Sequence, residues 1–293
     1  MKHKRFFRIS LAVVCAAALA VPVVGQAGSS NSNDSGRTFY ATDDQGQLLS
    51  FSADSPRQLD SLRKISGLPP GVSLKGIDFR PATGDLYGVG SDSVVYRLNP
   101  FTAIAVAEGP AFTPALRGRF FGWDFNPQVD RIRLTSDANQ NQRLHPDDAN
   151  VVGLDADLNP NDPTVVGSAY TNNDNDEIVV APAMPTPGTT GTMLFGIDSG
   201  TDSLVLQAPP NDGVLSTIGE LGARTNKVVG FDVLSKVEGG KAVANTAYAS
   251  LRKHGRTRLY EVDLATGDTD RIYGYGRSWA FAHVGDIAIR PQG

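Results

Sequence analysis

Gly76–Pro81 reads GIDFRP and Gly122–Pro127 reads GWDFNP, two near-copies of one short phrase. Each copy is followed by a turn and then by a strand-like run, Leu86–Val89 after the first and Arg131–Leu134 after the second. A repeated phrase, turn and strand of this kind predicts a periodic β-hairpin and therefore a repeat architecture.

Two weaker copies, which begin at Gly167 and Gly230, extend the repeat. Aligned on the third residue of the phrase, the four copies lie at positions 78, 124, 169 and 232, so that successive steps are 46, 45 and 63 residues. Steps of about 40 to 50 residues are typical of β-propeller blades. The sequence predicts an all-β fold, a β-propeller of five four-stranded blades. Six blades are the alternative, because the long third step has room for an extra hairpin.

The two ends of the sequence are predicted to share one blade. Asp286–Pro291 reads DIAIRP and matches the end of the repeated phrase, but little sequence follows it. Three strand-like runs near the N-terminus, at 38–42, 48–51 and 59–65, can supply the missing strands. We therefore expect Ile287–Ile289 to pair with Phe39–Ala41, since a closed ring has no exposed sheet edges. Residues 38–293 are predicted to form this single domain.

Residues 1–27 have the features of an export signal: a basic start at Met1–Arg5, an apolar run at Ile9–Val24, and small residues before a cut. The apolar run is shorter than the roughly 20 residues that span a bilayer, which favours cleavage over the alternative, a retained membrane anchor. The Ser- and Asn-rich residues 28–37 are predicted to be a flexible linker. We expect an extracytoplasmic protein, periplasmic or secreted, with no stable membrane anchor after cleavage.

The composition narrows the classes of partner. The formal net charge is −4, and it becomes −8 without residues 1–27, which hold four Lys and Arg residues and no acid. An acidic protein of this kind is not expected to bind nucleic acid. The only cysteine, Cys15, lies in the export signal, so no disulfide is expected. We expect a monomer whose partner is a small molecule, a glycan or a protein.

Several phrases, in order along most of the chain, carry a family resemblance. They are GIDFRPATG at 76–84 with Leu86 and Tyr87, Gly122 with DFNP at 124–127 and DRIR at 130–133, Asn141 with Arg143 and Leu144, AYTN at 169–172, and PPNDG at 209–213 with Leu215 and Gly219. In these phrases the chain resembles a bacterial family known as domain of unknown function 4394. The resemblance implies an exported, propeller-like domain with no assigned reaction. Trp123 departs from the family's phrase at an apolar strand position.

Three aspartates occupy the same place in three copies of the phrase: Asp78, Asp124 and Asp232. Because the first strand of each blade lines the central channel of a propeller, we expect them to form a ring of carboxylates. Such a ring could hold Ca²⁺, a hard cation that takes six to eight oxygen ligands. The favoured alternative is structural, with each aspartate bonded to backbone amides or to an arginine of the next blade. Three guanidinium groups would neutralise the carboxylates in that case, those of Arg80, Arg131 and Arg133.

Polar residues are dense around the second copy, in an otherwise apolar strand region. They are Asp124, Asn126, Asp130, Arg131, Arg133, Asn139, Asn141 and Arg143. At period two, Asp124 and Asn126 share one strand face, and Arg131 and Arg133 share one face of the next strand. The sequence therefore predicts a buried or half-buried acid–base network across this hairpin near the channel, with Asp130 in the turn.

Other candidates carry weaker signals. The Asx-rich stretches 155–162 and 172–177 offer oxygen ligands, but neither matches the EF-hand loop pattern, and solvated turns are the favoured interpretation. Three aromatic residues are expected in the core, with a sugar-stacking platform as the alternative: Phe120, Phe121 and Trp123. The sequence contains no HExxH, GxSxG or P-loop motif, and its histidines have no repeated partner.

A polar channel without a recognisable nucleophile or general base favours a non-enzymatic binding module. The alternative is a Ca²⁺-dependent hydrolase of the lactonase or phosphoesterase type, since fold alone does not decide function. No cofactor is required by the sequence, and Ca²⁺ is the one metal considered, with Asp78, Asp124 and Asp232 as its candidate ligands. The candidate ligand-binding or channel residues are Asp78, Arg80, Asp124, Asn126, Asp130, Arg131, Arg133, Asn141, Arg143, Asn172 and Asp232.

Overall fold

The structure, a computed structural model, describes residues 37–291 apart from 54, 56–57, 154, 175–190 and 273–282. The predicted export signal and nearly all of the predicted linker lie outside the described residues. The described part consists almost wholly of strands and connections, with a short 3-10 helix at Pro210–Asp212. None of its helices has the length and hydropathy needed to cross a bilayer.

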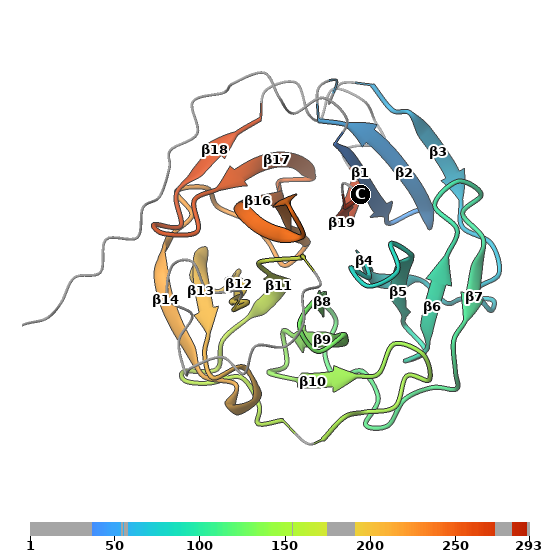
Figure 1. Cartoon of the computed structure of the whole chain (residues 1–293), viewed down its shortest axis with the longest axis horizontal. Coiled ribbons are helices and arrows are strands. Elements are labelled where there is room, and N and C mark those ends of the chain that lie inside the picture. Colours follow the sequence, from blue (N-terminus) through green and yellow to red (C-terminus); the bar gives the residue numbers. More distant parts are fainter. Residues whose placement is uncertain are drawn as a thin grey trace, which may run out of the picture.

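Five antiparallel sheets surround a central axis (Figure 1). From its inner to its outer strand, blade 1 consists of β19 (Val284–Ile289), β1 (Thr38–Asp43), β2 (Gln47–Ser52) and β3 (Ser61–Lys64). Blade 2 consists of β4 (Leu74–Phe79), β5 (Leu86–Gly90), β6 (Val95–Leu98) and β7 (Ala105–Ala107). Blade 3 consists of β8 (Phe121–Asn126), β9 (Arg131–Ser136) and β10 (Asn141–Leu144).

The last two blades follow the same inner-to-outer order. Blade 4 consists of β11 (Val165–Tyr170), β12 (Leu194–Asp198), β13 (Ser203–Gln207) and β14 (Leu215–Glu220). Blade 5 consists of β15 (Val229–Glu238), β16 (Lys241–Lys253), β17 (Arg256–Val262) and β18 (Thr269–Arg271). The inner strands β19, β4, β8, β11 and β15 are the first strands of the predicted repeats, as expected for a propeller.

The predicted closure through both ends of the chain is confirmed. β19 pairs antiparallel with β1, in the register Phe39↔Ile289, Tyr40↔Ala288 and Ala41↔Ile287. The last strand therefore becomes the inner strand of blade 1, and the N-terminal strands complete that blade (Figure 1). Because strands from both ends of the chain share this sheet, the array of blades has no open end.

The ring closes with five sheets, so the alternative of six blades is wrong. The long step of 63 residues arises inside blade 4, where residues 171–193 connect β11 to β12; part of this connection, 175–190, lies outside the described residues. Four sheets have the expected four strands, whereas blade 3 has three. A single antiparallel bridge between Leu144 and Val151 lies where its fourth strand would begin.

Apolar side chains fill four of the five interfaces between neighbouring blades. Separate buried clusters join blade 4 to 5, blade 5 to 1, blade 1 to 2 and blade 2 to 3. Phe121 and Trp123 belong to the last of these clusters, and Phe120 packs against the first, which confirms their expected place in the core. Because side chains alternate along β8, Trp123 faces blade 2 while Asp124 faces blade 4.

The interface between blades 3 and 4 is different in kind. Its apolar cluster contains only Leu158, Val165 and Val205 as buried members. Leu215 packs against this cluster as a partly buried residue. Polar side chains make further contacts in the interface, and the largest fully buried side chain of the described residues, Arg133, is one of them. Several of the polar residues that cluster around the second repeat in the sequence thus lie in the interface between blades 3 and 4.

Candidate functional site

The three repeated aspartates meet near the propeller axis. Asp78, Asp124 and Asp232 lie on the inner strands β4, β8 and β15, and each offers a carboxylate oxygen within 4.8 Å of the others. All three are buried. The equivalent positions of the other two inner strands are occupied by Ala169 on β11 and Ala288 on β19.

Each carboxylate reaches across a blade interface to a backbone amide. Asp78 Oδ2 accepts a hydrogen bond from the Phe125 amide at 2.8 Å, and Asp124 Oδ2 accepts one from the Tyr170 amide at 2.8 Å. Asp232 Oδ2 accepts the Ile289 amide at 2.5 Å. In every case the donor follows the aligned position of the next inner strand by one residue, so the contact repeats with the blades.

Two inner amides have an alanine in the preceding blade and therefore no carboxylate across the interface. The Phe79 amide, which follows Ala288 around the ring, donates instead to Oδ1 of its neighbour Asp78 at 2.6 Å. The Val233 amide, which follows Ala169, donates to Oδ1 of Asp232 at 2.6 Å. Three aspartates thus satisfy one amide on each of the five inner strands.

The need for these bonds follows from the topology. An inner strand has a ladder partner on its outer side only, so some of its amides point toward the axis with no strand to receive them. A buried amide without an acceptor destabilises the fold by about 1–3 kcal/mol. The aspartate ring therefore has a structural role that accounts for its position in the repeat. The prediction that these aspartates bind backbone amides is confirmed.

A fourth buried carboxylate continues the pattern one layer along the axis. Asp286 on β19 accepts the Ile77 amide of β4 through Oδ2 at 2.8 Å. The other four inner strands have glycine at this layer, and a Cβ added to Gly76 would lie 2.5 Å from Cβ of Trp123. Glycine thus allows neighbouring inner strands to approach closely, which keeps the axis narrow.

Burial sets the protonation of the ring. Loss of solvent raises the pKa of the Asp78 and Asp124 carboxyls well above the usual range, and the nearby carboxylates, including Asp232, raise them further. Burial also raises the pKa of Asp286 well above its ordinary value and that of Asp232 to about 6. The amide hydrogen bonds oppose these shifts but do not cancel them. The raised pKa values favour the protonated forms of these carboxyls, which limits the repulsion between them.

A divalent cation would have to compete with these protons and amides. Ca²⁺ takes six to eight oxygen ligands, and the ring offers six carboxylate oxygens from Asp78, Asp124 and Asp232. Five of the six already accept a backbone amide. One oxygen of each aspartate lies within 4.8 Å of the other two, so Asp78, Asp124 and Asp232 could supply three ligands to a hard cation once deprotonated, and Ca²⁺ would need further oxygens.

The predicted neutralisation of the ring by arginine is wrong. Arg80 binds Asp130 and Asp147, and the Arg131 guanidinium donates to the backbone carbonyls of its own turn, at residues 129 and 130. Arg133 lies opposite Asp124 in the β8–β9 register, but its guanidinium extends into the interface with blade 4. The acid–base network predicted across one hairpin is therefore divided between two blade interfaces.

Arg133 organises the polar interface between blades 3 and 4. Its Nη1 donates to Asp155 Oδ2 at 2.7 Å and to Asn141 Oδ1 at 2.7 Å, and its Nη2 donates to Asn211 Oδ1 at 2.8 Å. Its Nε donates to the Tyr170 hydroxyl at 3.3 Å. Asp155 is shared with Arg143, whose Nη2 lies 2.8 Å from Oδ1. Sequence reasoning identified the two arginines and Asn141, but it gave no signal that Asp155 is their partner.

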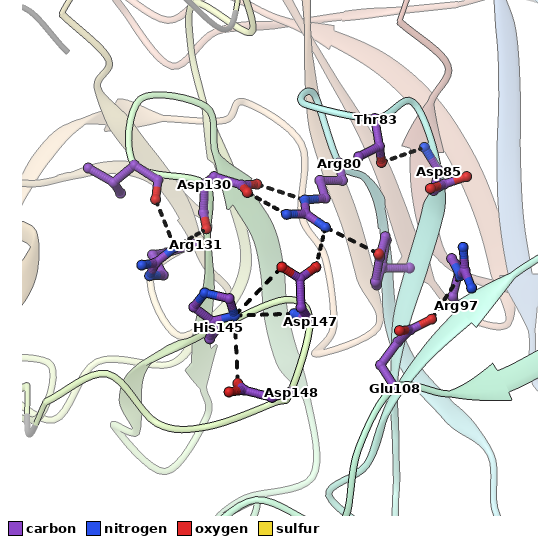
Figure 2. A network of polar contacts seen from close by, with 12 residues as sticks. Arg80, Thr83, Asp85, Arg97, Glu108, Asp130, Arg131, His145, Asp147 and Asp148 are labelled. Atoms are coloured by element: carbon purple, nitrogen blue, oxygen red, sulfur yellow. Dashed lines mark hydrogen bonds and ion pairs between the residues drawn. The ribbon is translucent and has the colours of Figure 1, made fainter. Parts of the chain in front are cut away.

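Arg80 forms a second cluster of polar contacts (Figure 2). The cluster lies at the face of the propeller where the inner strands β4 and β8 end. We call this the turn face; it carries the turns at 80–85 and 127–130 and the connection at 145–150. Arg80 binds both oxygens of Asp130, and its Nη1 donates to Asp147 at 2.6 Å. These contacts join blade 2 to blade 3. The Asp147 side chain is 58% exposed, so the outer part of this cluster faces solvent.

His145 and Asp148 border the cluster of Arg80 at the surface (Figure 2). His145 Nδ1 accepts the Asp147 amide at 3.3 Å and lies 3.6 Å from an oxygen of Asp148. Among the described residues, no contact brings a nucleophilic side chain to this histidine.

The remaining sequence candidates have local roles. Asn126 Oδ1 accepts the Gln128 amide at 3.0 Å and shapes the β8–β9 turn. Asn172 exchanges two hydrogen bonds with Asn245 at 3.0 and 2.8 Å, which ties the end of β11 to the long β15–β16 hairpin. In the stretch 155–162, Asp155, Asp157 and Asp162 all bind protein groups. Residues 175–177 of the other Asx-rich stretch lie outside the described residues.

Several solved structures resemble this chain weakly, at low sequence identity. The crystal structure of a nidogen/laminin complex includes a chain with 13% identity and a TM-score of 0.43, covering 87% of this chain and 98% of that one. A protein of unknown function from Bacteroides thetaiotaomicron has 14% identity and a TM-score of 0.45, covering 85% and 62%. A candidate 6-phosphogluconolactonase from Bacteroides uniformis has 14% identity and a TM-score of 0.39, covering 88% and 72%.

No curated protein matches the sequence. The sequence does match, over residues 47–287, the family described as "Domain of unknown function (DUF4394)". This match spans all five blades from β2 into β19, and it includes the three aspartates of the axial ring. The chain therefore belongs to the DUF4394 family.

Proposed function

We propose that this protein is a non-enzymatic binding module, exported and monomeric, that holds a small molecule, a glycan or a protein on the turn face of its propeller. One observation carries the proposal. The axial carboxylates, which would be the catalytic centre of a channel enzyme, are buried and already bonded to the amides of the inner strands. Their geometry supports the closed ring and leaves ligand binding to the faces.

The turn face of blades 2 and 3 has the chemistry that fits a polar ligand. Asp147 and Asp148 have side chains that are 58% and 53% exposed, and His145 stands between them at 34%. Arg80 Nη1 donates a hydrogen bond to Asp147, so the position of this carboxylate is fixed before a ligand binds. Preorganised acceptors and an imidazole suit the hydroxyl groups of a glycan or another polar small molecule.

The experiment that tests this proposal uses matched histidine variants. His145→Asn changes the turn face, and His254→Asn makes the same substitution in the β16–β17 turn, which the antiparallel order of strands places on the opposite face. Wild type and both variants are screened on a glycan array and a metabolite panel, and hits are measured by calorimetry. We expect at least tenfold weaker binding for His145→Asn alone, with equal melting temperatures. A ligand bound equally by all three proteins would contradict the proposed face.

The second candidate function is a Ca²⁺-dependent hydrolase, and the approach of three carboxylate oxygens to within 4.8 Å favours it. Elemental analysis of protein purified without chelator separates the two candidates. One Ca²⁺ per chain, together with turnover of a lactone or phosphoester that is lost in Asp124→Asn, would replace the binding module with the hydrolase. Substoichiometric Ca²⁺ and no turnover would support the binding module.

A further inference from the structure

The five blade interfaces are not equally apolar. Four are filled by clusters of buried hydrophobic side chains, whereas the interface between blades 3 and 4 has Leu158, Val165 and Val205 as its buried apolar members. Separation of two apolar surfaces exposes them to water, which opposes opening. Separation of two polar surfaces exchanges internal hydrogen bonds for bonds to water, and the net change is much smaller.

Polar contacts replace the missing apolar cluster. Arg133, which is 1% exposed, crosses the interface to Tyr170 and Asn211. Hydroxyl groups meet where β9 faces β11, with Thr135 Oγ1 2.7 Å from Ser168 Oγ. Every one of these groups is strongly hydrated when it is exposed, and for a buried ion pair such as Arg133–Asp155 the desolvation penalty offsets most of the attraction.

We propose that the ring opens between blades 3 and 4, and that this interface is the route by which water and small solutes reach the axis. The opening separates β8 from β11, and it breaks the bond from the Tyr170 amide to Asp124. Asp124 then becomes accessible while the four apolar interfaces stay closed. The interface between blades 3 and 4 thus acts as a polar seam, whereas the other four interfaces also contain large apolar clusters. The opening does not depend on which ligand the turn face binds.

Three backbone amides give an internal comparison. Those of Phe125, Tyr170 and Ile289 each donate to an aspartate of the preceding blade, across the interfaces 2–3, 3–4 and 5–1 respectively. Since the partner chemistry is the same, differences in their hydrogen exchange report the opening of the interface that each one spans. We expect the Tyr170 amide to exchange at least tenfold faster than the other two in wild-type protein, measured by NMR. Its exchange should depend little on low urea, because seam opening exposes little apolar surface.

A reversible cross-link tests the same seam directly. Thr135→Cys with Ser168→Cys places two thiols across the interface, and oxidised glutathione closes the disulfide; the sequence's own cysteine is Cys15, which is replaced by Ser in every variant. The matched control is Ser50→Cys with Ser61→Cys, whose hydroxyl oxygens are 2.8 Å apart inside blade 1. Oxidation of the first pair should slow Tyr170 to the rate of Phe125, and oxidation of the control pair should leave it unchanged.

Two outcomes would overturn the proposal. In the first, the three amides of wild-type protein exchange at similar rates and with the same dependence on urea, which would mean that the ring opens only by global unfolding. In the second, the control disulfide within blade 1 slows Tyr170 as much as the disulfide across the seam. Neither outcome bears on the turn face, whose binding is tested separately by His145→Asn.

Discussion

The buried aspartate ring predicts that the propeller loses stability as the pH rises above about 4. The pKa of Asp232 is raised from 3.8 to about 6 in the folded protein by burial. The folded state therefore holds a proton that the unfolded state has released, and stability falls with rising pH between the two values. At about 1.4 kcal/mol per pH unit, over about two units, Asp232 alone removes roughly 3 kcal/mol from the free energy of unfolding.

Other buried carboxyls also lower the stability as the pH rises, and the carboxyls with lowered pKa values affect stability only in acid. The pKa values of Asp78, Asp124 and Asp286 are also raised by burial, so their deprotonation extends the loss toward alkaline pH. The pKa values of Asp137 and Asp148 are lowered, so their contribution is complete above about pH 4 and is lost only in acid. From pH 5 to pH 8 we therefore expect a net fall in stability.

The assay is urea unfolding followed by far-UV circular dichroism at half-unit steps between pH 5 and pH 8. Asp232→Asn should flatten the profile, because the amide cannot ionise. It should also be less stable than wild type at pH 5 by about 1–3 kcal/mol, since Asn has one acceptor oxygen for the Val233 and Ile289 amides. The gap between the two profiles should narrow by about 1.4 kcal/mol between pH 5 and pH 6.

Asp148→Asn is the control, because this exposed carboxyl has a lowered pKa and should leave the slope above pH 5 unaltered. A wild-type stability that is constant or rises from pH 5 to pH 8 would refute the reasoning about the ring. So would an Asp232→Asn variant with the wild-type slope.

Three further predictions concern packing and closure. Arg133→Ala should lower the free energy of unfolding by about 3 kcal/mol or more, because it leaves buried acceptors unpaired. Arg131→Ala should change it by about 0.5 kcal/mol or less, because the Arg131 guanidinium binds carbonyls of its own turn. Similar urea midpoints for the two variants would contradict the assigned partners. Deletion of residues 284–293 removes β19 and its pairing with β1, and we expect aggregation or a sharply lower melting temperature; unchanged melting would contradict closure. Gly76→Ala should lower the free energy of unfolding by about 1–3 kcal/mol, because its Cβ would lie 2.5 Å from Trp123 Cβ. Gly285→Ala should be tolerated, because no atom lies nearer than 3.6 Å to the added Cβ. Equal melting temperatures of the two variants would contradict the close approach of β4 and β8.

The sequence by itself determined the blades, their closure and the residues of the axial ring. A blade is encoded by local patterns, namely a repeated phrase, a turn and alternating side chains. Each of these patterns lies within a short stretch of sequence and can be identified there without knowledge of the rest of the fold. The equivalence of Asp78, Asp124 and Asp232 followed from the repeat alone, and the pairing of Ile287–Ile289 with Phe39–Ala41 followed from the need to close a ring.

Only the tertiary structure decided which group each polar side chain binds. The Asp124 carboxylate and the Tyr170 amide are 46 residues apart, and Asp286 and the Ile77 amide are 209 apart. Such pairs depend on the angle and separation of whole blades, and no local pattern records them. Arginine could therefore be expected beside the ring, whereas in the folded protein the backbone amides of the inner strands occupy the carboxylates and Arg133 is held by Asp155 in the neighbouring interface. Buried amides and buried guanidinium groups compete for the same acceptors, and the geometry of the closed ring settles which of them each acceptor receives.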